Sequence, residues 1–304
     1  MNRFERSWSL FKSSLFVVVR NKELLIFPIF ISMATAVIFL FFFAPAALWP
    51  TGFSYFSAEH WHALADKYFR SYGTEKNPHF TLSPIAGAYA AFLYLISMFV
   101  ATFFNVAFYN EILAALNGEP VSLSRGLRFA CSRWKAILMW ALFAGLIGLI
   151  IKVIEEKFEV VGSFIAKFVG LAWSIASVFV IPVIVRDESS SNPITMLKKS
   201  AGTLRQVWGE GLIGYVGIGA INMIVFVSSM AVVVVAAIIS AQLHFFWLLG
   251  FVIAGWVLTM IIWSYLMNVA SLVYKGALFL YASEGIVCEP YDQDLLNSAW
   301  KYKK

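Results

Sequence analysis

Two short patterns place metal-binding or acid–base side chains close together in the sequence. His60 and His62 are two residues apart, and Glu155 and Glu156 are adjacent. Alternate positions on a helix face different ways, adjacent positions point about 100° apart, and neither pattern has a third ligand at a familiar spacing. We therefore expect a surface role for the histidines and a solvated rim for the glutamates. The sequence predicts no catalytic residue, no metal site and no cofactor.

A third pattern, Gly209, Gly211 and Gly214, has the spacing of a dinucleotide-binding fingerprint. That fingerprint requires a preceding strand, whereas these glycines follow a basic segment and begin an apolar one. Small residues in an apolar segment more commonly allow a neighbouring helix to approach closely.

Three asparagines, Asn105, Asn222 and Asn268, are the strongest polar groups within the apolar tracts. Such amides usually form hydrogen bonds between helices, each contributing about 0.6–2 kcal/mol, although they can also line a water-filled cavity. The middle of each tract lacks a charged residue, which argues against an ion-coupled transporter. A passive channel or carrier for a small solute or lipid stays open as an alternative.

The composition identifies the class of protein that carries these side chains. Of 304 residues, 61% are apolar and only 13% are charged, too few to cover the surface of a soluble globule. About 20 residues of helix cross a hydrocarbon core of roughly 30 Å. Six apolar tracts approach or exceed that length, at 24–49, 81–110, 136–151, 168–185, 211–243 and 244–273. The sequence thus predicts an all-α integral membrane protein with six transmembrane helices.

The distribution of Lys and Arg predicts the orientation of these helices. One side holds 17 of the 23 basic residues, and basic residues mark the cytoplasmic side. We expect both termini to lie in the cytoplasm and the chain to reside in the inner cell membrane. The net charge of +6 then lies at an anionic leaflet, and we expect no nucleic-acid partner. Cys131 and Cys288 both fall on this side, where thiols stay reduced.

The N-terminal segment 3–20 has the pattern of an amphipathic helix that lies on the membrane surface. Arg6, Ser13 and Arg20 oppose the apolar side. An apolar run of about 20 residues follows, which is too long for a cleavable signal peptide. The apolar stripe is Phe4, Trp8, Phe11 and Leu15.

The same spacing recurs twice, before the third and fifth apolar tracts. The corresponding stripes are Leu123, Leu127, Ala130 and Trp134, and then Leu197, Ala201, Leu204 and Trp208. We therefore predict three hairpins, each preceded by an amphipathic cytoplasmic interfacial helix. The single domain, 1–304, would comprise repeats 2–116, 121–186 and 192–285 and a tail, 286–304. Any basic connection before a span would give a similar pattern, which is the simpler interpretation.

A further amphipathic helix is predicted over 54–70 on the outer side, with Phe56, Leu64 and Tyr68 facing inward.

Several segments resemble a known family. They are 133–134, 154–156, 172–174, 180–184, 204–209 and 274–285. The chain is similar over nearly its whole length to an uncharacterised bacterial family of six-span inner-membrane proteins. It is more distantly similar to the membrane domain that accompanies some glycerophosphodiester phosphodiesterases. These motifs are structural, so the resemblance implies a fold and assigns no active-site residue.

The basic residues of the three interfacial helices suggest a function. We expect Arg6, Arg125, Arg128 and Lys199 to face cytoplasmic headgroups, because they lie opposite the apolar stripes. The sequence therefore favours a membrane scaffold, or a component that binds lipid or a partner, with no enzymatic activity. Anionic lipids are the expected partners, with a protein partner or a second copy of the chain as further alternatives.

Overall fold

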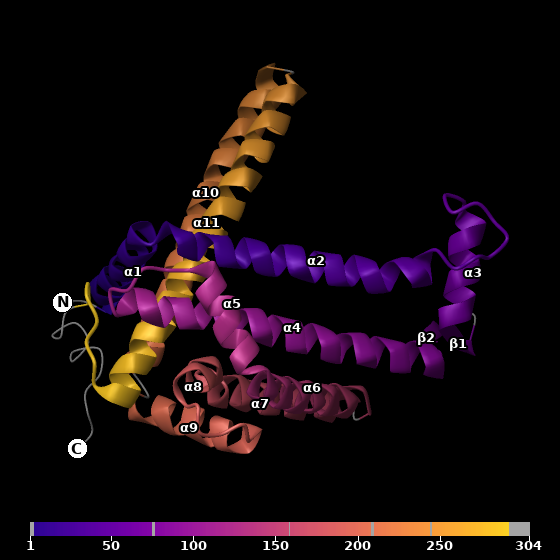
Figure 1. Cartoon of the computed structure of the whole chain (residues 1–304). Helices are drawn as coiled ribbons and strands as arrows, with labels where there is room; N and C mark the ends of the chain where they lie inside the picture. The colour runs from indigo at the N-terminus through magenta and orange to yellow at the C-terminus, as the bar shows by residue number, and fades with distance from the viewer. Residues whose placement is uncertain (1–2, 75–76, 158, 208–209, 244, 292–304) are drawn as a thin grey trace.

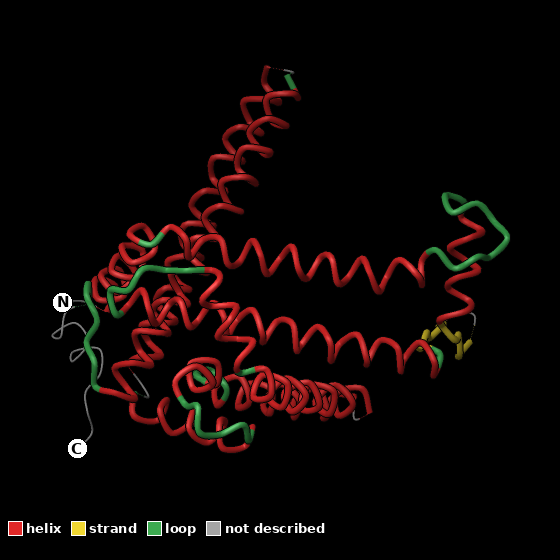
Figure 2. The backbone as a smooth tube through the Cα atoms, viewed as in Figure 1, coloured by secondary structure: helices red, strands yellow, loops and turns green. Residues whose placement is uncertain are grey.

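The computed structural model describes residues 3–74, 77–157, 159–207, 210–243 and 245–291 (Figure 1). Side chains are not described at 3–7, 70–74, 77–81, 156–157, 159–163, 210–218, 220 and 246. Within the described residues, six helical segments are long and apolar enough to cross a membrane. The prediction of a six-span helical protein is confirmed to that extent, and helices dominate the backbone (Figure 2).

Three shorter helices occur where the interfacial helices are predicted. They are α1 (Arg3–Arg20), α5 (Leu123–Ser132) and α9 (Pro193–Gln206). Ser122 begins α5 by accepting a hydrogen bond from the backbone N–H of Arg125, and Asn192 begins α9 in the same way through Ile194 and Thr195. Trp134 does not belong to α5: it is the first residue of the next helix and is half exposed. Trp208 lies outside the described residues.

The long helices follow the apolar tracts. Ser83 and Pro84 begin α4, and Gly285, with φ of 69°, ends α11. Helix α10 ends at Leu243 and α11 begins at Phe246, and the two helices pack along each other. The elements are η1 (Lys22–Leu25), α2 (Ile26–Ala47), α4 (Pro84–Leu116), α6 (Trp134–Lys157), α7 (Glu159–Ala176), α8 (Val180–Arg186), α10 (Glu210–Leu243) and α11 (Phe246–Glu284).

The fourth span is interrupted, contrary to the prediction of one continuous helix. Its two parts, α7 and α8, are separated by a turn at 177–179. Ser200 of α9 fills this break: its hydroxyl donates to the carbonyl of Ala176 (2.6 Å) and accepts from the backbone N–H of Phe179 (3.0 Å). Ser200 is fully buried, so these backbone groups are satisfied by the protein itself and the break does not open a binding site.

The core lies where α4, α8 and α11 end. Most residues are buried over 106–116 of α4, 180–185 of α8 and 269–282 of α11. Toward the opposite end, the side chains of the α10–α11 hairpin are mostly exposed, and the hairpin diverges from α2, α4, α6 and α7 (Figure 1). We call the end that contains the core the base of the bundle.

The short helices pack in a cyclic order at the base. Helix α5 packs on α4 of the first hairpin, and α9 packs on α7 and α8 of the second. Helix α1 packs on α10 and α11 of the third. The helices form three pairs: α2 with α4, α6 with α7 and α8, and α10 with α11. Each short helix contacts the pair that precedes its own, with the last pair counted before the first, and α9 also contacts α11 of its own pair.

The buried face of α1 differs from the predicted stripe. Leu10, Phe11, Ser14, Val17 and Val18 are buried, whereas Trp8 is partly exposed and Leu15 is half-buried. The sequence pattern missed this face because it assumed that every large apolar residue turns away from water. Burial is decided instead by the contacts of α1 with α10 and α11.

The outer segment after α2 also departs from the prediction. The expected helix over 54–70 is shorter, α3 (Ala58–Tyr68), so Phe56 precedes it and is fully exposed. Two strands, β1 (Phe69–Thr74) and β2 (Asn77–Leu82), form an antiparallel hairpin beside it, so the chain is not entirely α-helical.

His60 is buried, contrary to the expected surface role. Its Nε2 donates to the carbonyl of Ala47 (3.0 Å), and its Nδ1 lies 2.6 Å from Thr51 Oγ1. These hydrogen bonds attach α3 to the end of α2. His62 is exposed, so the two histidines do not converge.

Candidate functional site at the base of the bundle

A buried carboxylate joins α4 to α5. Glu111 has a side chain with no exposed surface, and Arg125 holds it with two parallel hydrogen bonds, from Nε to Oε1 (3.0 Å) and from Nη2 to Oε2 (2.8 Å). The backbone N–H of Ser122 donates to Oε2 (2.7 Å), and the amide of Asn110 donates to Oε1 (2.9 Å). A buried carboxylate is tolerated when it is paired and hydrogen-bonded in this way. The pair therefore fixes the start of α5 against the last turns of α4.

A glycine allows this pairing. Gly126 is buried next to α4, and a Cβ atom built on it would lie 2.7 Å from the carbonyl oxygen of Ala107 and 3.0 Å from Cγ of Glu111. Only a residue without a side chain lets the two backbones approach this closely. Arg125 thus provides the cation that pairs with Glu111, and Gly126 provides the close approach of α5 to α4 that the pairing requires.

A second ion pair occupies the corresponding place between α8 and α9. Lys199 of α9 donates to the carboxylate of Asp187, which follows α8 and also accepts from Ser189 Oγ (2.5 Å). The hydrogen bonds from Lys199 and Ser189 hold the pKa of Asp187 below its usual value. The hydrogen bond to Glu111 similarly raises the pKa of Arg125. Arg125 and Lys199 stand at equivalent positions of the predicted stripes, and each binds an acid at the end of the preceding hairpin.

Two further arginines connect elements at the base. Arg186 makes two hydrogen bonds to Glu284 of α11, at 2.8 and 2.6 Å. Arg133 donates to the carbonyl groups of Ile184, Asp187 and Glu188. Its positive charge there interacts favourably with the partial negative charge at the C-terminal end of α8. These contacts join the second hairpin to the third and fix the end of α8.

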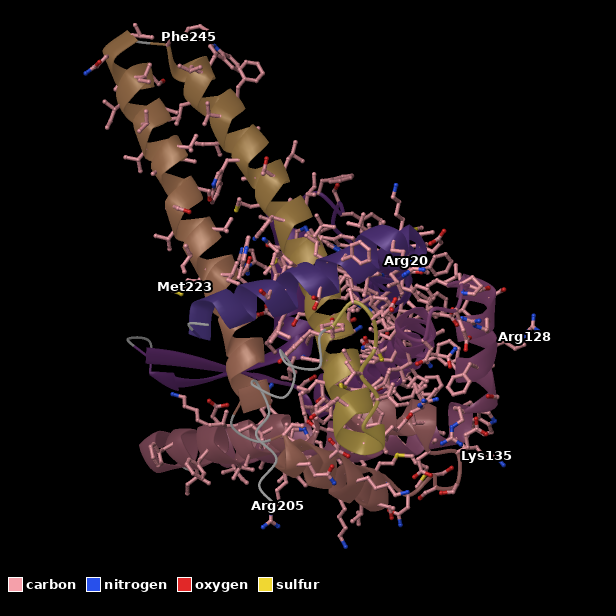
Figure 3. The ribbon with its side chains drawn as sticks, turned by 90° about the vertical axis from the view of Figure 1, so that its left-hand side faces the viewer. Arg20, Arg128, Lys135, Arg205, Met223 and Phe245 are labelled. Carbon is pink, nitrogen blue, oxygen red and sulfur yellow. The ribbon has the colours of Figure 1, made fainter. Side chains whose placement is uncertain are left out.

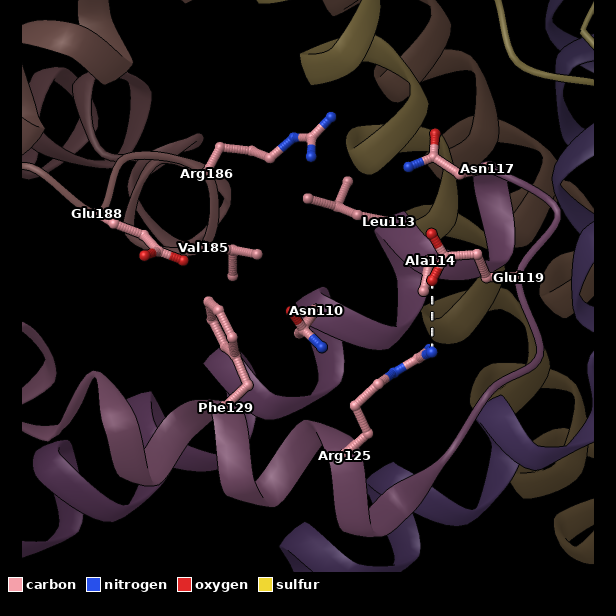
Figure 4. A pocket seen from close by; sticks show the side chains of 10 residues that line it. All are labelled: Asn110, Leu113, Ala114, Asn117, Glu119, Arg125, Phe129, Val185, Arg186 and Glu188. Atoms are coloured by element: carbon pink, nitrogen blue, oxygen red, sulfur yellow. Dashed lines mark hydrogen bonds and ion pairs between the residues drawn. The ribbon is translucent and has the colours of Figure 1, made fainter.

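A cavity of about 330 Å³ lies among these contacts, between the ends of α4, α5 and α8 (Figure 4). Its walls combine the aliphatic side chains and one phenyl ring with amides and four charged groups. A second cavity, of about 400 Å³, lies on the other side of Arg186, against α9 and α11. The first cavity is lined by Asn110, Leu113, Ala114, Asn117, Glu119, Arg125, Phe129, Val185, Arg186 and Glu188.

A different set of basic side chains surrounds the base. These residues are exposed, and none forms an ion pair with a described residue. Figure 3 shows four of them, Arg20, Arg128, Lys135 and Arg205, around the periphery of this end. We call the exposed set the basic rim; it comprises Lys12, Arg20, Lys22, Arg128, Lys135, Lys198 and Arg205.

The four bases expected to face headgroups therefore differ in their surroundings. Arg128 belongs to the basic rim, whereas Arg125 and Lys199 are engaged in ion pairs. The side chain of Arg6 lies outside the described residues. The sequence analysis missed Glu111, which directly follows the predicted apolar tract 81–110 and lies 14 positions before Arg125.

The three asparagines do not meet at one site. Asn222 accepts a hydrogen bond from Nε1 of Trp263 (2.9 Å), as expected for an amide that joins two helices. Asn105 is half-buried in α4 and Asn268 is exposed on α11. Neither of the two cavities at the base is lined by these residues.

These features define a six-span helical membrane protein whose base combines ion pairs, two cavities and the exposed basic rim. Residues 85–288, more than half of the chain, match a family of unknown function, DUF6159. The chain belongs to this family. No curated protein and no solved structure matches it.

Proposed function

We propose that this protein is a non-catalytic component of the inner cell membrane that binds anionic lipid through its basic rim. The proposal rests on the presence of two distinct sets of basic residues at the base of the bundle, one bound within the protein and one exposed. Arg125, Arg133, Arg186 and Lys199 bind groups within the protein, whereas the basic rim remains exposed where three membrane-spanning helices end. A base near an anionic surface contributes about 1 kcal/mol to association.

The proposed orientation places the basic rim and both termini in the cytoplasm. The excess of Lys and Arg at this end supports it. The cyclic packing of α1, α5 and α9, together with the equivalent pairs of Arg125 and Lys199, supports three repeated units of helix and hairpin. We propose in addition that α1, α5 and α9 lie at the membrane surface as interfacial helices. The distant similarity to phosphodiesterase membrane domains would be one of architecture only.

The test uses the full chain in lipid nanodiscs. Substituting Arg20, Arg128, Lys135 and Arg205 by Gln should lower the retention of phosphatidylglycerol, measured by native mass spectrometry, and should reduce its dependence on salt. These side chains are exposed, so the thermal stability should change little. Exposed charges are screened beyond roughly 8 Å at physiological salt, which is why the effect should be largest at low salt.

Two single variants that remove the same charge at different places test whether the location of the basic residue matters. Arg128→Gln removes a base of the rim, whereas Lys167→Gln removes an exposed base from α7. Only the former should reduce phosphatidylglycerol retention. Equal lipid retention by the quadruple variant and the unaltered protein at all salt concentrations would refute the proposal. Solute flux through proteoliposomes would instead favour the passive carrier.

A further inference from the structure

The two arginines of the cavity between α4, α5 and α8 are already neutralised. Arg125 is held by Glu111, and Arg186 is held by Glu284; neither carboxylate is itself part of the cavity lining. The charges that remain on the lining are the carboxylates of Glu119 and Glu188. Glu119 makes only a long contact to Arg125 (3.4 Å), and the carboxylate of Glu188 has no partner among the described residues. Among the lining residues and their ion-pair partners, four carboxylates outnumber two guanidinium groups, so the lining carries an excess of negative charge. Arg133, whose guanidinium binds the backbone carbonyl of Glu188, lies outside the lining.

The uncharged lining also favours a cation. The amide nitrogen of Asn110 donates to Glu111, so the carbonyl oxygen is the group that this lining residue can offer as an acceptor. Phe129 adds an aromatic ring, whose face attracts cations. Figure 4 shows Glu188 and Glu119 reaching into the cavity from opposite walls, with Asn110 and Phe129 between them. Several acceptors around a confined volume suit a group with several N–H donors.

The position of the cavity indicates the source of such a group. It lies where the candidate spans Pro84–Leu116 and Phe164–Arg186 both end, at the boundary between the apolar segments and the charged base. Lipid headgroups occupy this level of a bilayer. A volume of about 330 Å³ is within the usual range for a small-ligand site.

We propose that this cavity binds a primary ammonium group, carried by the headgroup of an aminophospholipid or by a small free amine. Glu188 and Glu119 supply the negative charge, and Asn110 supplies a neutral acceptor. This inference goes beyond binding of anionic lipid by the basic rim, since it concerns other residues and a ligand group of opposite charge.

The experiment compares lipids that differ only in the ammonium group. The full chain in nanodiscs of phosphatidylethanolamine and phosphatidylcholine should retain phosphatidylethanolamine selectively in native mass spectrometry, because a quaternary ammonium has no N–H donor. Free ethanolamine should displace it, whereas tetramethylammonium should not. The Glu119→Gln/Glu188→Gln variant should retain roughly tenfold less phosphatidylethanolamine, as expected for loss of hydrogen bonds to charged groups. The exposed Glu23, outside the cavity, provides the control Glu23→Gln.

Each outcome bears on the proposal. Selective retention that is lost in the double variant and kept in Glu23→Gln supports the lipid as the source. Binding of ethanolamine without enrichment of phosphatidylethanolamine supports a free amine. Equal retention of both lipids together with no binding of ethanolamine would overturn the proposal. Binding by the double variant equal to that of the unaltered protein would overturn it as well. Because the variants of the basic rim are scored with phosphatidylglycerol, failure of one proposal does not imply failure of the other.

Discussion

The hydroxyl groups of Ser14 and Tyr291 lie 2.8 Å apart, although 277 residues separate them in the chain. Both side chains are buried, and Ser13 Oγ also donates to the carbonyl of Pro290 (3.4 Å). The segment after α11 therefore returns to α1 and contacts it through Pro290 and Tyr291. This contact is a long-range constraint on the position of α1.

Loss of this contact should destabilise the base. Tyr291→Phe removes one hydrogen bond, at a cost of about 1 kcal/mol, while Ser14→Ala leaves the buried phenol without a partner and costs about 1–3 kcal/mol. The double variant should lose less than the sum of the two changes. Thermal unfolding in detergent provides the measurement, with Ser9→Ala on the same helix as the control. Strict additivity would show that the two hydroxyls are not coupled.

Tyr291 should also make the fold sensitive to alkali. Burial raises the pKa of its phenol above the ordinary value of 10.0. The unfolded chain then ionises first as the pH increases, so the stabilisation from Tyr291 is complete below about pH 10 and is lost as the pH rises toward the folded-state pKa. Unfolding at increasing pH should show a steeper decline for the unaltered protein than for Tyr291→Phe. Parallel declines would contradict this prediction.

The two cysteines should differ in reactivity. Cys131 is exposed, whereas burial, with a smaller contribution from Glu284, raises the pKa of Cys288 to about 11. Thiolates are the reactive form, so a maleimide near neutral pH should label Cys131 and leave Cys288 unmodified. Mass spectrometry of Cys131→Ser should show almost no labelling. Ser14→Ala in that background should increase it, because the covering segment is less firmly held; rapid labelling of Cys131→Ser alone would be inconsistent with the buried site.

The sequence was sufficient for features that depend on local pattern. The spans and the three short helices lie where apolar length and helical periodicity predict them. Features that depend on distant partners were missed. The break at 177–179 lies just before Pro182, whose ring leaves no N–H for the carbonyl of Val178, and it is stabilised by Ser200, more than 20 residues away. His60 gave no sign of burial, since its partners Ala47 and Thr51 lie before α3.

The candidate site shows the same division. The stripe pattern located Arg125 and Lys199 on the helices where they occur, but it could not distinguish a base that binds a carboxylate from one that faces solvent. That distinction requires the position of Glu111 and Asp187 relative to α5 and α9. Arg128, three residues after Arg125 and on nearly the same side of α5, is exposed, which the periodicity alone could not predict.

The pair of Glu111 and Arg125 should contribute more to stability than the charges of the basic rim. Arg125→Met leaves a buried carboxylate unpaired, and Arg125 is itself partly exposed, so we expect a loss of about 3 kcal/mol. Combining it with Glu111→Met should restore part of this loss, because no buried charge then remains. Glu119→Gln, on the exposed side of Arg125, should change stability by at most about 0.5 kcal/mol. Equal effects of Arg125→Met and Glu119→Gln would disprove the role of the buried pair.

Two glycines of the short helices should respond oppositely to the same substitution. In Gly126→Ala the new methyl would lie 2.7 Å from the backbone carbonyl of Ala107 and near Phe27, so α5 must shift away from α4, at a cost of about 1–3 kcal/mol. In Gly202→Ala the methyl meets no atom within 4 Å, and alanine favours the helix by roughly 0.5–1 kcal/mol. Melting temperatures should therefore fall for the first variant and rise for the second. Because both changes add one methyl group to a short helix at the base, their difference reports the close approach of α5 to α4; a rise for both would mean that Gly126 is not required for that packing.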